Sequence, residues 1–350
     1  MKLICGPMAT LSHPAFRRLV GKFGGCDEYF TEMINAGTLL TGGPFEKYYL
    51  DPSPFPERTV WQLIGKSGEL IVRAAGELAR LPGLGVDINM GCSAPDIYRY
   101  GSGIAWMMRP LPETARMVSA VRNELERRGT EGAGRKRLSV KIRLGDEDFS
   151  AAGFVEFCSM LADSGAELVT VHPRTRKEKL VRPPRWEFCG MAAEVLGKKG
   201  VPVYINGNVR DEASARAAMA VAPGCAGIMI SREAARSPWI FMQLSSALDG
   251  NVRSPEPPVM RDGCVDLMEL ALDFISDVEM CQPPEFWRTR LQRFFSYYCD
   301  NFKFSHYART SLLNAADNDD LRTRLGDFFS RCPDERMRRI SFPCGKDENH

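Results

Sequence analysis

Eight short apolar runs recur along the first two thirds of this 350-residue chain, each bounded by Gly, Pro or charged residues. Apolar residues at three- and four-residue spacing fill the segments between them, so the pattern predicts strands alternating with helices, and hence a parallel sheet. Eight such strands favour a closed β/α (TIM) barrel, and the lack of a GxGxxG motif after the first run argues against an open doubly wound sheet. The predicted strands are residues 3–8, 28–34, 59–65, 85–91, 138–144, 167–172, 202–206 and 227–231, and the predicted helices are residues 14–23, 70–81, 113–128, 154–164, 191–199 and 212–221.

The composition changes after residue 248. Residues 249–262 are rich in Gly, Asn, Ser and Pro, which is typical of a linker. No strand pattern returns beyond it, so we expect a small all-helical domain over residues 263–342 and a tail over residues 343–350. The helices of this domain are expected at residues 264–280, 286–302, 307–316 and 321–329, with residues 317–320 as the turn and amino-terminal cap of the last of them.

Charge and cysteine content argue against several classes of protein. Lys and Arg total 46 while Asp and Glu total 44, so the net charge of +2 gives no general attraction to nucleic acid or to a membrane. The 11 cysteines include no CxxC pair and no histidine at zinc spacing, which argues against a metal site and a disulfide framework. There is no leader pattern and no apolar stretch long enough to cross a bilayer, so we predict a cytoplasmic protein without a membrane partner.

Polar residues occupy the carboxyl ends of the predicted strands, where the catalytic groups of a β/α barrel lie. Lys141 stands inside an apolar run and requires a partner or water; taken alone, it is as readily a structural ion-pair residue as a cofactor-binding or Schiff-base lysine. His172 alone is more readily a structural histidine, and Gln62 could tie down a loop. Together, these residues bring an amine, an imidazole and an amide to one mouth, which predicts an active site there.

The last two predicted strands end in residues typical of a phosphate site. Asn206 and Gly207 follow the seventh strand, and residues 227–232 contain the eighth. Backbone amides and the start of a short helix hold phosphate at this position in many such barrels. The two segments together support a phosphorylated cofactor.

Cys92 follows the fourth strand, directly after Gly91. A cysteine is most often a small buried apolar residue, and this is our interpretation of most of the others. The turn that Gly91 permits would expose Cys92 instead, and the glycines in residues 100–105 are typical of a mobile loop that closes over a substrate. Cys92 is therefore the candidate acid.

In this order, the motifs resemble those of the tRNA-dihydrouridine synthases, FMN-dependent enzymes that reduce uridine in tRNA. The asparagine-x-glycine-cysteine motif of that family matches residues 89–92, its lysine-x-arginine motif matches residues 141–143, and its histidine-x-arginine-threonine motif matches residues 172–175. The resemblance covers nearly the whole chain, from Gly6-Pro7-Met8 to Tyr307-Ala308-Arg309.

The resemblance implies a role for each matched residue. Cys92 would be the catalytic acid, and Asn89, Arg143 and Arg174 would contact the target base or its nucleotide. The residues that would bind or lie against FMN are Pro7, Met8, Gln62, Lys141, His172, Asn206, Gly207, Asn208, Ser231 and Arg232.

The implied reaction also assigns chemistry to these groups. NADPH or NADH reduces FMN, a hydride passes from flavin N5 to C6 of uracil, and a proton reaches C5 from the opposite face. A thiol is mostly protonated near neutral pH and can donate that proton, while Lys141 would stabilise the negative charge of the reduced flavin. The uridine must leave its stack to reach the mouth, at a cost of about a few kcal/mol.

The predicted helical domain is the expected RNA-binding surface. Between residues 287 and 341 the chain has eleven Lys or Arg against seven Asp or Glu, a local excess of four positive charges, with Tyr297, Tyr298 and Tyr307 interleaved. The alternative is a solvated charged face with the tyrosines in a helical core. The expectation is thus an FMN-binding catalytic barrel over residues 1–248 and a tRNA-binding domain over residues 263–342, in a monomer without a metal.

Several positions depart from the family pattern. Ser93 stands where proline is usual, Pro173 and Ser231 where glycine is usual, Cys5-Gly6 where alanine precedes the Pro-Met pair, and Asn208 where an acid is common. The chain is identified as a divergent member. Three alternatives stay open: an FMN barrel that reduces a free pyrimidine or enone, an aldolase-like barrel in which Lys141 forms a Schiff base, and a barrel that binds RNA without catalysis.

Overall fold

The structure is a computed structural model that describes residues 1–147, 149–178, 181–249 and 259–340. Its internal contacts divide the chain into two compact units. The barrel unit comprises residues 1–7, 27–209 and 213–230, and the helical unit comprises residues 8–26, 210–212 and the chain from residue 231 onward.

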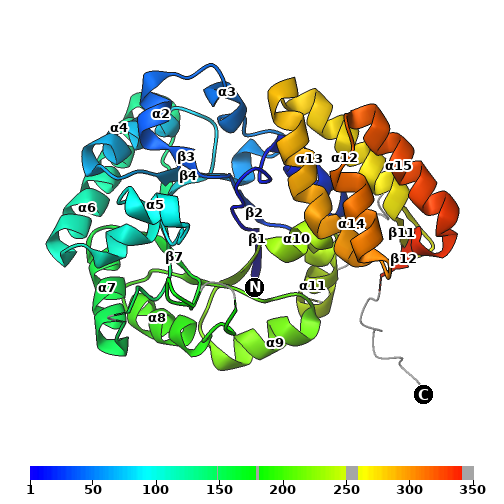
Figure 1. The fold of residues 1–350 in the computed structure, drawn as a ribbon. Helices are drawn as coiled ribbons and strands as arrows, with labels where there is room; N and C mark the ends of the chain where they lie inside the picture. Colours follow the sequence, from blue (N-terminus) through cyan, green and yellow to red (C-terminus); the bar gives the residue numbers. More distant parts are fainter. Residues whose placement is uncertain (148, 179–180, 250–258, 341–350) are drawn as a thin grey trace. The chain divides into compact units, whose positions relative to one another are not determined.

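The barrel unit is built on eight parallel strands that close into a ring (Figure 1). The strands are β1 (Lys2–Cys5), β2 (Glu28–Phe30), β4 (Thr59–Ile64), β5 (Gly85–Met90), β6 (Arg137–Ile142), β7 (Leu168–Val171), β8 (Val203–Asn206) and β9 (Gly227–Ile230), with the two-residue β3 (Ile34–Asn35) added beside β4. The pairing of β2 with β4, in which Tyr29 lies opposite Thr59, completes the ring. The predicted eight-stranded parallel barrel is confirmed.

Helices follow the strands of this unit, and most of them lie along the outside of the ring in Figure 1. They are α2 (Ala36–Thr41), α3 (Glu46–Tyr49), α4 (Gly68–Ala79), α5 (Pro95–Arg99), α6 (Leu111–Arg128), α7 (Ala151–Asp163), α8 (Glu187–Gly197) and α9 (Glu212–Val221). Strand residues such as Val60, Val86 and Val140 are fully buried, which is why the strands read as continuous apolar runs.

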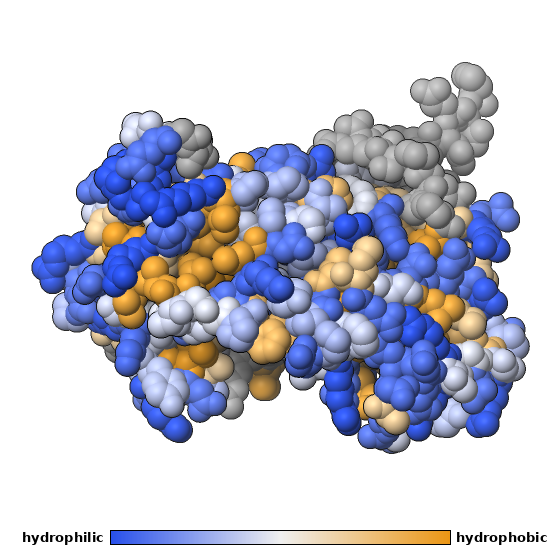
Figure 2. Space-filling view, turned by 90° about the horizontal axis from the view of Figure 1, so that it is seen from above, coloured by the Kyte–Doolittle hydropathy of each residue, from blue (hydrophilic) through white to orange (hydrophobic). Residues whose placement is uncertain are grey.

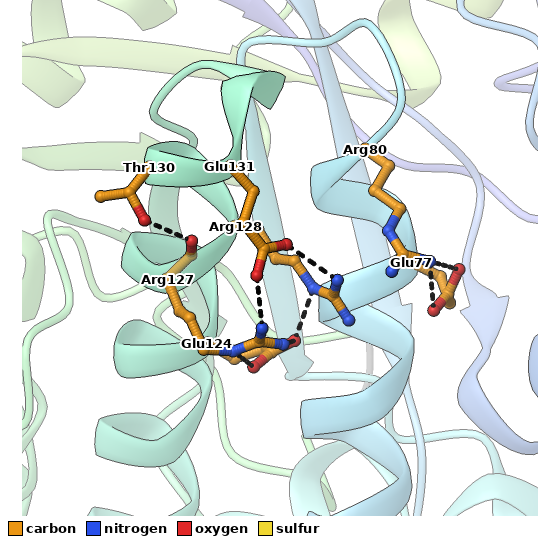
Figure 3. Close-up of polar contacts among 7 residues, drawn as sticks. All are labelled: Glu77, Arg80, Glu124, Arg127, Arg128, Thr130 and Glu131. Atoms are coloured by element: carbon orange, nitrogen blue, oxygen red, sulfur yellow. Dashed lines mark hydrogen bonds and ion pairs between the residues drawn. The ribbon is translucent and has the colours of Figure 1, made fainter.

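The carboxyl end of α6 carries positive charges that neighbouring acids neutralise (Figure 3). Glu124 accepts hydrogen bonds from Arg127 at 2.7 Å and from Arg128 at 2.9 Å, and Glu131 accepts from the same two arginines. Since each arginine is matched by a carboxylate, this surface offers little net charge to a polyanion.

A buried ion-pair cluster occupies the interior at the amino-terminal ends of the strands. Glu28 is almost fully buried and accepts hydrogen bonds from Arg137 at 2.6 and 3.0 Å, from Lys2 at 2.9 Å and from the hydroxyl of Tyr204 at 3.0 Å. Burial alone would raise the pKa of Glu28, but its bonds to Arg137 and Lys2 and their charges outweigh this and hold the pKa at about 2.

The helical unit contains α1 (Pro14–Phe23), α10 (Arg232–Arg236), α11 (Ile240–Asp249), α12 (Leu267–Cys281), α13 (Pro284–Tyr298), α14 (Ser305–Leu313) and α15 (Asn318–Arg331). The predicted helices are present, and the Asp317 side chain caps α15 by accepting from the backbone N–H of Asp320 at 2.9 Å. An aromatic cluster fills the core, with the rings of Phe274 and Phe294 separated by 4.0 Å between centroids.

The structure adds strands to this unit that the sequence pattern did not predict. The antiparallel strands β10 (Met260–Arg261), β11 (Cys264–Asp266) and β12 (Met337–Arg339) form a small sheet. The expectation that no strand follows the linker is therefore wrong. Strands of two or three residues, partly charged, are too short to show a strand period. The boundaries expected at residues 248 and 263 stay a prediction, and residues 250–258 and the expected tail lie outside the described residues.

The face drawn in Figure 2 is mainly hydrophilic, and its apolar side chains lie in separate patches. Within the described ranges, no helix is long and apolar enough to cross a membrane.

We expect Glu28→Ala to lower the free energy of unfolding by about 3 to 5 kcal/mol at neutral pH, because it leaves Arg137 buried without its carboxylate. Urea denaturation measures this loss. In the wild-type protein, the pKa of Glu28 lies below its unfolded value of 4.5, so its stabilisation is present above pH 4.5 and disappears as the pH falls towards about 2. A Glu28→Ala protein as stable as the wild type at pH 7 would contradict this role.

Candidate active site

Lys141 reaches the mouth of the barrel from β6. Its Nζ donates to Oδ1 of Asn206 on β8 at 2.9 Å, and Nδ2 of Asn206 donates to the carbonyl of Met229 at 2.8 Å. The strand register places Lys141 beside Asn89 on β5 and Thr170 on β7. The structure thus brings Lys141, Asn206 and Asn89 together. Since Asn206 is a neutral acceptor, it leaves the ammonium charge available to an anionic group.

Cys92 sits in a turn whose backbone is held from two sides. Oδ1 of Asn89 accepts from the backbone N–H of Cys92 at 2.8 Å and of Gly91 at 3.1 Å. On the other side, Nε of Arg143 donates to the carbonyl of Gly91 at 2.9 Å. Cys92 is half-buried, as are Cys264, Cys281 and Cys332, whereas Cys5 and five other cysteines are buried.

The segment after α5 packs against this turn. The backbone N–H of Ile104 donates to the carbonyl of Cys92 at 3.0 Å. Gly103 has a φ of +62°, and a Cβ at this position would lie 2.6 Å from the Cys92 carbonyl oxygen, so the close approach requires glycine. The predicted loop is therefore in contact with Cys92, and its mobility stays a prediction.

His172 is oriented by Arg174. Nη1 of Arg174 lies 2.8 Å from Nε2 of His172, and its Nε donates to the carbonyl of Arg182 at 2.5 Å. A guanidinium can only donate, so Nε2 of His172 acts as the acceptor and the ring proton resides on Nδ1. Arg174 is fully buried, so in this structure it supports His172; its predicted contact with a nucleotide stays a prediction.

Gly207 permits another close approach. Its φ is +117°, and a Cβ there would lie 2.9 Å from Cδ2 of His172. The loop after β8 can pass the imidazole because this position has no side chain.

The mouth is electropositive. Desolvation lowers the pKa of Lys141 to about 8, helped by the charge of Arg143 and opposed by Asp87. Burial and the charge of Arg174 lower the pKa of Arg143 to about 10. Both groups are still cationic at neutral pH, and each destabilises the charged form of the other. An anionic ligand beside them would relieve this repulsion.

Asp87 is a buried polar residue below the mouth that was not among the residues predicted from the sequence. Asp87 is fully buried, and its Oδ1 and Oδ2 accept from Oγ of Ser139 and Nε2 of Gln62, each at 2.7 Å. Burial raises the pKa of Asp87 from 3.8 to about 6 despite these bonds. A lone aspartate within the apolar run 85–91 was the available signal.

Gln62 is also fully buried, and its Oε1 accepts from Nδ2 of Asn89 at 2.9 Å. Pro7 and Asn208 belong to the barrel unit, and both are half-buried. Met8, Ser231 and Arg232 belong to the helical unit. The cofactor roles predicted for these residues stay predictions.

Acids pair with many of the basic side chains of the helical unit. Arg309 pairs with Asp300, Arg322 with Glu279, Arg324 with Asp320 and Arg336 with Asp266. Tyr298 is fully buried and donates to the carbonyl of Leu267 at 2.7 Å, so it belongs to the core. Exposed Arg288 and Arg293 form no ion pair with any described residue, although Arg293 stacks on Tyr297.

No group of three His, Cys, Asp or Glu side chains in the described part of the chain is arranged to hold a metal ion. The polar side chains at the mouth include an amine, guanidinium groups, amides, an imidazole and a thiol. A β/α barrel with these groups at the carboxyl ends of its strands has the architecture of a barrel enzyme.

Comparison with known proteins identifies the family. Residues 3–319 match the family model of dihydrouridine synthase. The chain is 30% identical over 270 residues to tRNA-dihydrouridine(16) synthase of Cupriavidus necator, covering 74% of this chain and 78% of that protein. It is 32% identical over 252 residues to a probable tRNA-dihydrouridine synthase of Rhodobacter capsulatus, covering 71% and 72%. The chain belongs to the dihydrouridine synthase family of oxidoreductases.

We expect Asp87→Asn to stabilise the protein at neutral pH. The pKa of Asp87 lies above its unfolded value of 3.8, so the native state holds this proton more tightly and wild-type stability falls as the pH rises from 3.8 to about 6. The variant lacks this titration and should gain about 3 kcal/mol relative to the wild type by pH 7. Urea denaturation of both proteins across this pH range is the measurement, and a difference that does not change with pH would contradict it.

Proposed function

We propose that this protein reduces uridines of tRNA to dihydrouridine, with FMN as cofactor, NAD(P)H as reductant and Cys92 as proton donor. One observation carries the proposal: the Cys92 turn is hydrogen-bonded to Asn89, at the mouth that also contains Lys141. Family membership supports the reaction, and the similarity to tRNA-dihydrouridine synthases supports tRNA as the substrate.

The donors at the mouth suit a flavin mononucleotide. The pyrimidine edge of a flavin presents hydrogen-bond acceptors, and Lys141 has three N–H donors, of which Asn206 uses one. Gln62 likewise retains an amide hydrogen after its bond to Asp87. We assign these two residues and His172 to the ring. The remaining proposed cofactor contacts are Pro7, Met8, Asn206, Gly207, Asn208, Ser231 and Arg232.

FMN, when bound, supplies the hydride that reduces the uracil. Lys141 stabilises negative charge beside it, and this role requires a pH below its pKa of about 8. Cys92 provides the proton at C5 of the base. Asn89 and Arg143 keep the Cys92 turn in place, and we propose that Asn89, Arg143 and Arg174 also contact the target nucleotide.

We propose that the helical unit binds the RNA. Arg288 and Arg293 on α13 support this, because exposed arginines without an acidic partner are free to contact phosphate.

Cys92→Ala should lower the rate of dihydrouridine formation by about 10² to 10⁴-fold, because it removes the general acid, while FMN stays bound. Mass spectrometry of tRNA after reaction, which detects the added mass of two hydrogen atoms, gives the rate, and the visible absorbance of the purified protein gives the FMN content. Cys264→Ala, at another half-buried cysteine, is the control and should react normally. A Cys92→Ala protein with normal turnover would refute the acid role.

Replacing Arg288 and Arg293 together with alanine should weaken tRNA binding and reduce the slope of log K against log salt by about 1 to 2, since two phosphate contacts are lost. Fluorescence titration at several salt concentrations measures both quantities. The matched control is Arg322→Ala, because Glu279 already neutralises Arg322. An unchanged slope in the double variant would exclude these arginines from the interface.

A further inference from the structure

A chain of hydrogen bonds runs from Asp87 to the Cys92 turn through two amide side chains. Asp87 accepts from Nε2 of Gln62 at 2.7 Å, and Oε1 of Gln62 accepts from Nδ2 of Asn89 at 2.9 Å. Oδ1 of Asn89 then accepts from the backbone N–H groups of Gly91 and Cys92. Asp87 and Gln62 are fully buried and Asn89 nearly so, so this chain is shielded from solvent.

The hydrogen bonds from Asp87 to the Cys92 turn can run in only one direction. An ionised carboxylate only accepts, so Asp87 requires the NH2 group of Gln62 to face it. The carbonyl of Gln62 must then face Asn89, which turns the NH2 group of Asn89 towards Gln62 and its carbonyl towards the Cys92 turn. The backbone N–H groups at the far end can only donate, so the two ends require the same orientation of both amides. A reversed amide would leave a buried donor or acceptor unpaired.

We propose that Asp87 is a positioning residue that acts through Gln62 to set the direction of the amides at the Cys92 turn, so that its carboxylate requires an amide, and not a second carboxylate, at position 89. This proposal rests on the proposed acid role of Cys92. Asp87 does not contact the thiol; it selects the orientation of the amides that hold the Cys92 backbone. Its hydrogen-bond partners, Gln62 and Ser139, are both neutral, so the buried carboxylate costs free energy that a space-filling apolar residue would not.

The direction can be tested by moving the carboxylate to the other end of Gln62. Asn89→Asp places Gln62 between two carboxylates, so its carbonyl must face one of them. The double variant Asp87→Asn/Asn89→Asp lets Gln62 turn round: its carbonyl accepts from Asn at position 87, and its NH2 group faces Asp at position 89. That new carboxylate still accepts from the N–H groups of the turn. Asp87→Asn alone keeps the original direction of both amides. The NH2 group of the asparagine at position 87 can donate to the hydroxyl of Ser139, and its carbonyl can still accept from Gln62.

Four full-length proteins are compared: the wild type, both single variants and the double variant. One readout is dihydrouridine formation on tRNA, with the rate of flavin reduction by NADPH measured separately. The other is the alkylation rate of Cys92 by iodoacetamide, followed by peptide mass spectrometry without RNA or NADPH, with Cys264 as the internal control.

Asp87→Asn is the reference for the double variant: the N–H groups of the turn still require the same direction of both amides, so this variant should change both readouts less than Asn89→Asp does. Asn89→Asp should slow dihydrouridine formation at least tenfold and change the Cys92 alkylation rate at least threefold, and the double variant should return the alkylation rate to within twofold of the wild type. Flavin reduction and the alkylation of Cys264 should stay within twofold throughout.

Two outcomes would overturn the proposal. One is a Cys92 alkylation rate in the double variant that equals the rate in Asn89→Asp. The other is a Cys92 alkylation rate in Asn89→Asp that equals the wild-type rate. If the wild-type protein forms no dihydrouridine but the alkylation rates follow the expected pattern, the proposed function fails and the positioning role of Asp87 stands.

Discussion

The closure of eight parallel strands into one ring is the constraint on which the rest of the structure depends. The pairing of β2 with β4 completes the ring, so residues far apart in the sequence share one interior. Lys141 and Asn206 are 65 residues apart, yet they form a hydrogen bond at 2.9 Å. Because the strands are parallel, their carboxyl ends lie at the same mouth, and the groups proposed for catalysis meet there.

Two buried carboxylates in the interior of this ring have opposite effects on the stability of the protein. The amino-terminal end contains a cluster in which Glu28 is bonded to Arg137 and Lys2, and its lowered pKa indicates net stabilisation of the charge. Above it, Asp87 has a raised pKa, so its ionised form is unfavourable in the native state. The same carboxylate fixes the direction of Gln62 and Asn89. One buried acid therefore stabilises the fold, and the other orients the site at the expense of stability.

Ion pairs determine which basic side chains outside the barrel interior are available to bind an anion. The sequence of the helical domain has an excess of positive charge, but four of its arginines face acids, and a similar balance holds at the end of α6. A count of charges cannot separate paired from free side chains, because pairing depends on packing between helices. Exposed Arg288 and Arg293 are therefore the arginines that we propose to contact RNA.

The sequence by itself determined the eight strands, the helices between them, a helix cap within residues 317–320 and the family motifs, because each depends on periodicity or on neighbouring residues. It could also single out Lys141 as a polar residue in an apolar run. The tertiary structure alone decided that Asp87 and Gln62 join Asn89, that Arg174 supports His172, and that three short strands form a sheet. These features depend on contacts between strands or segments that are distant in sequence. Local sequence patterns do not predict such contacts.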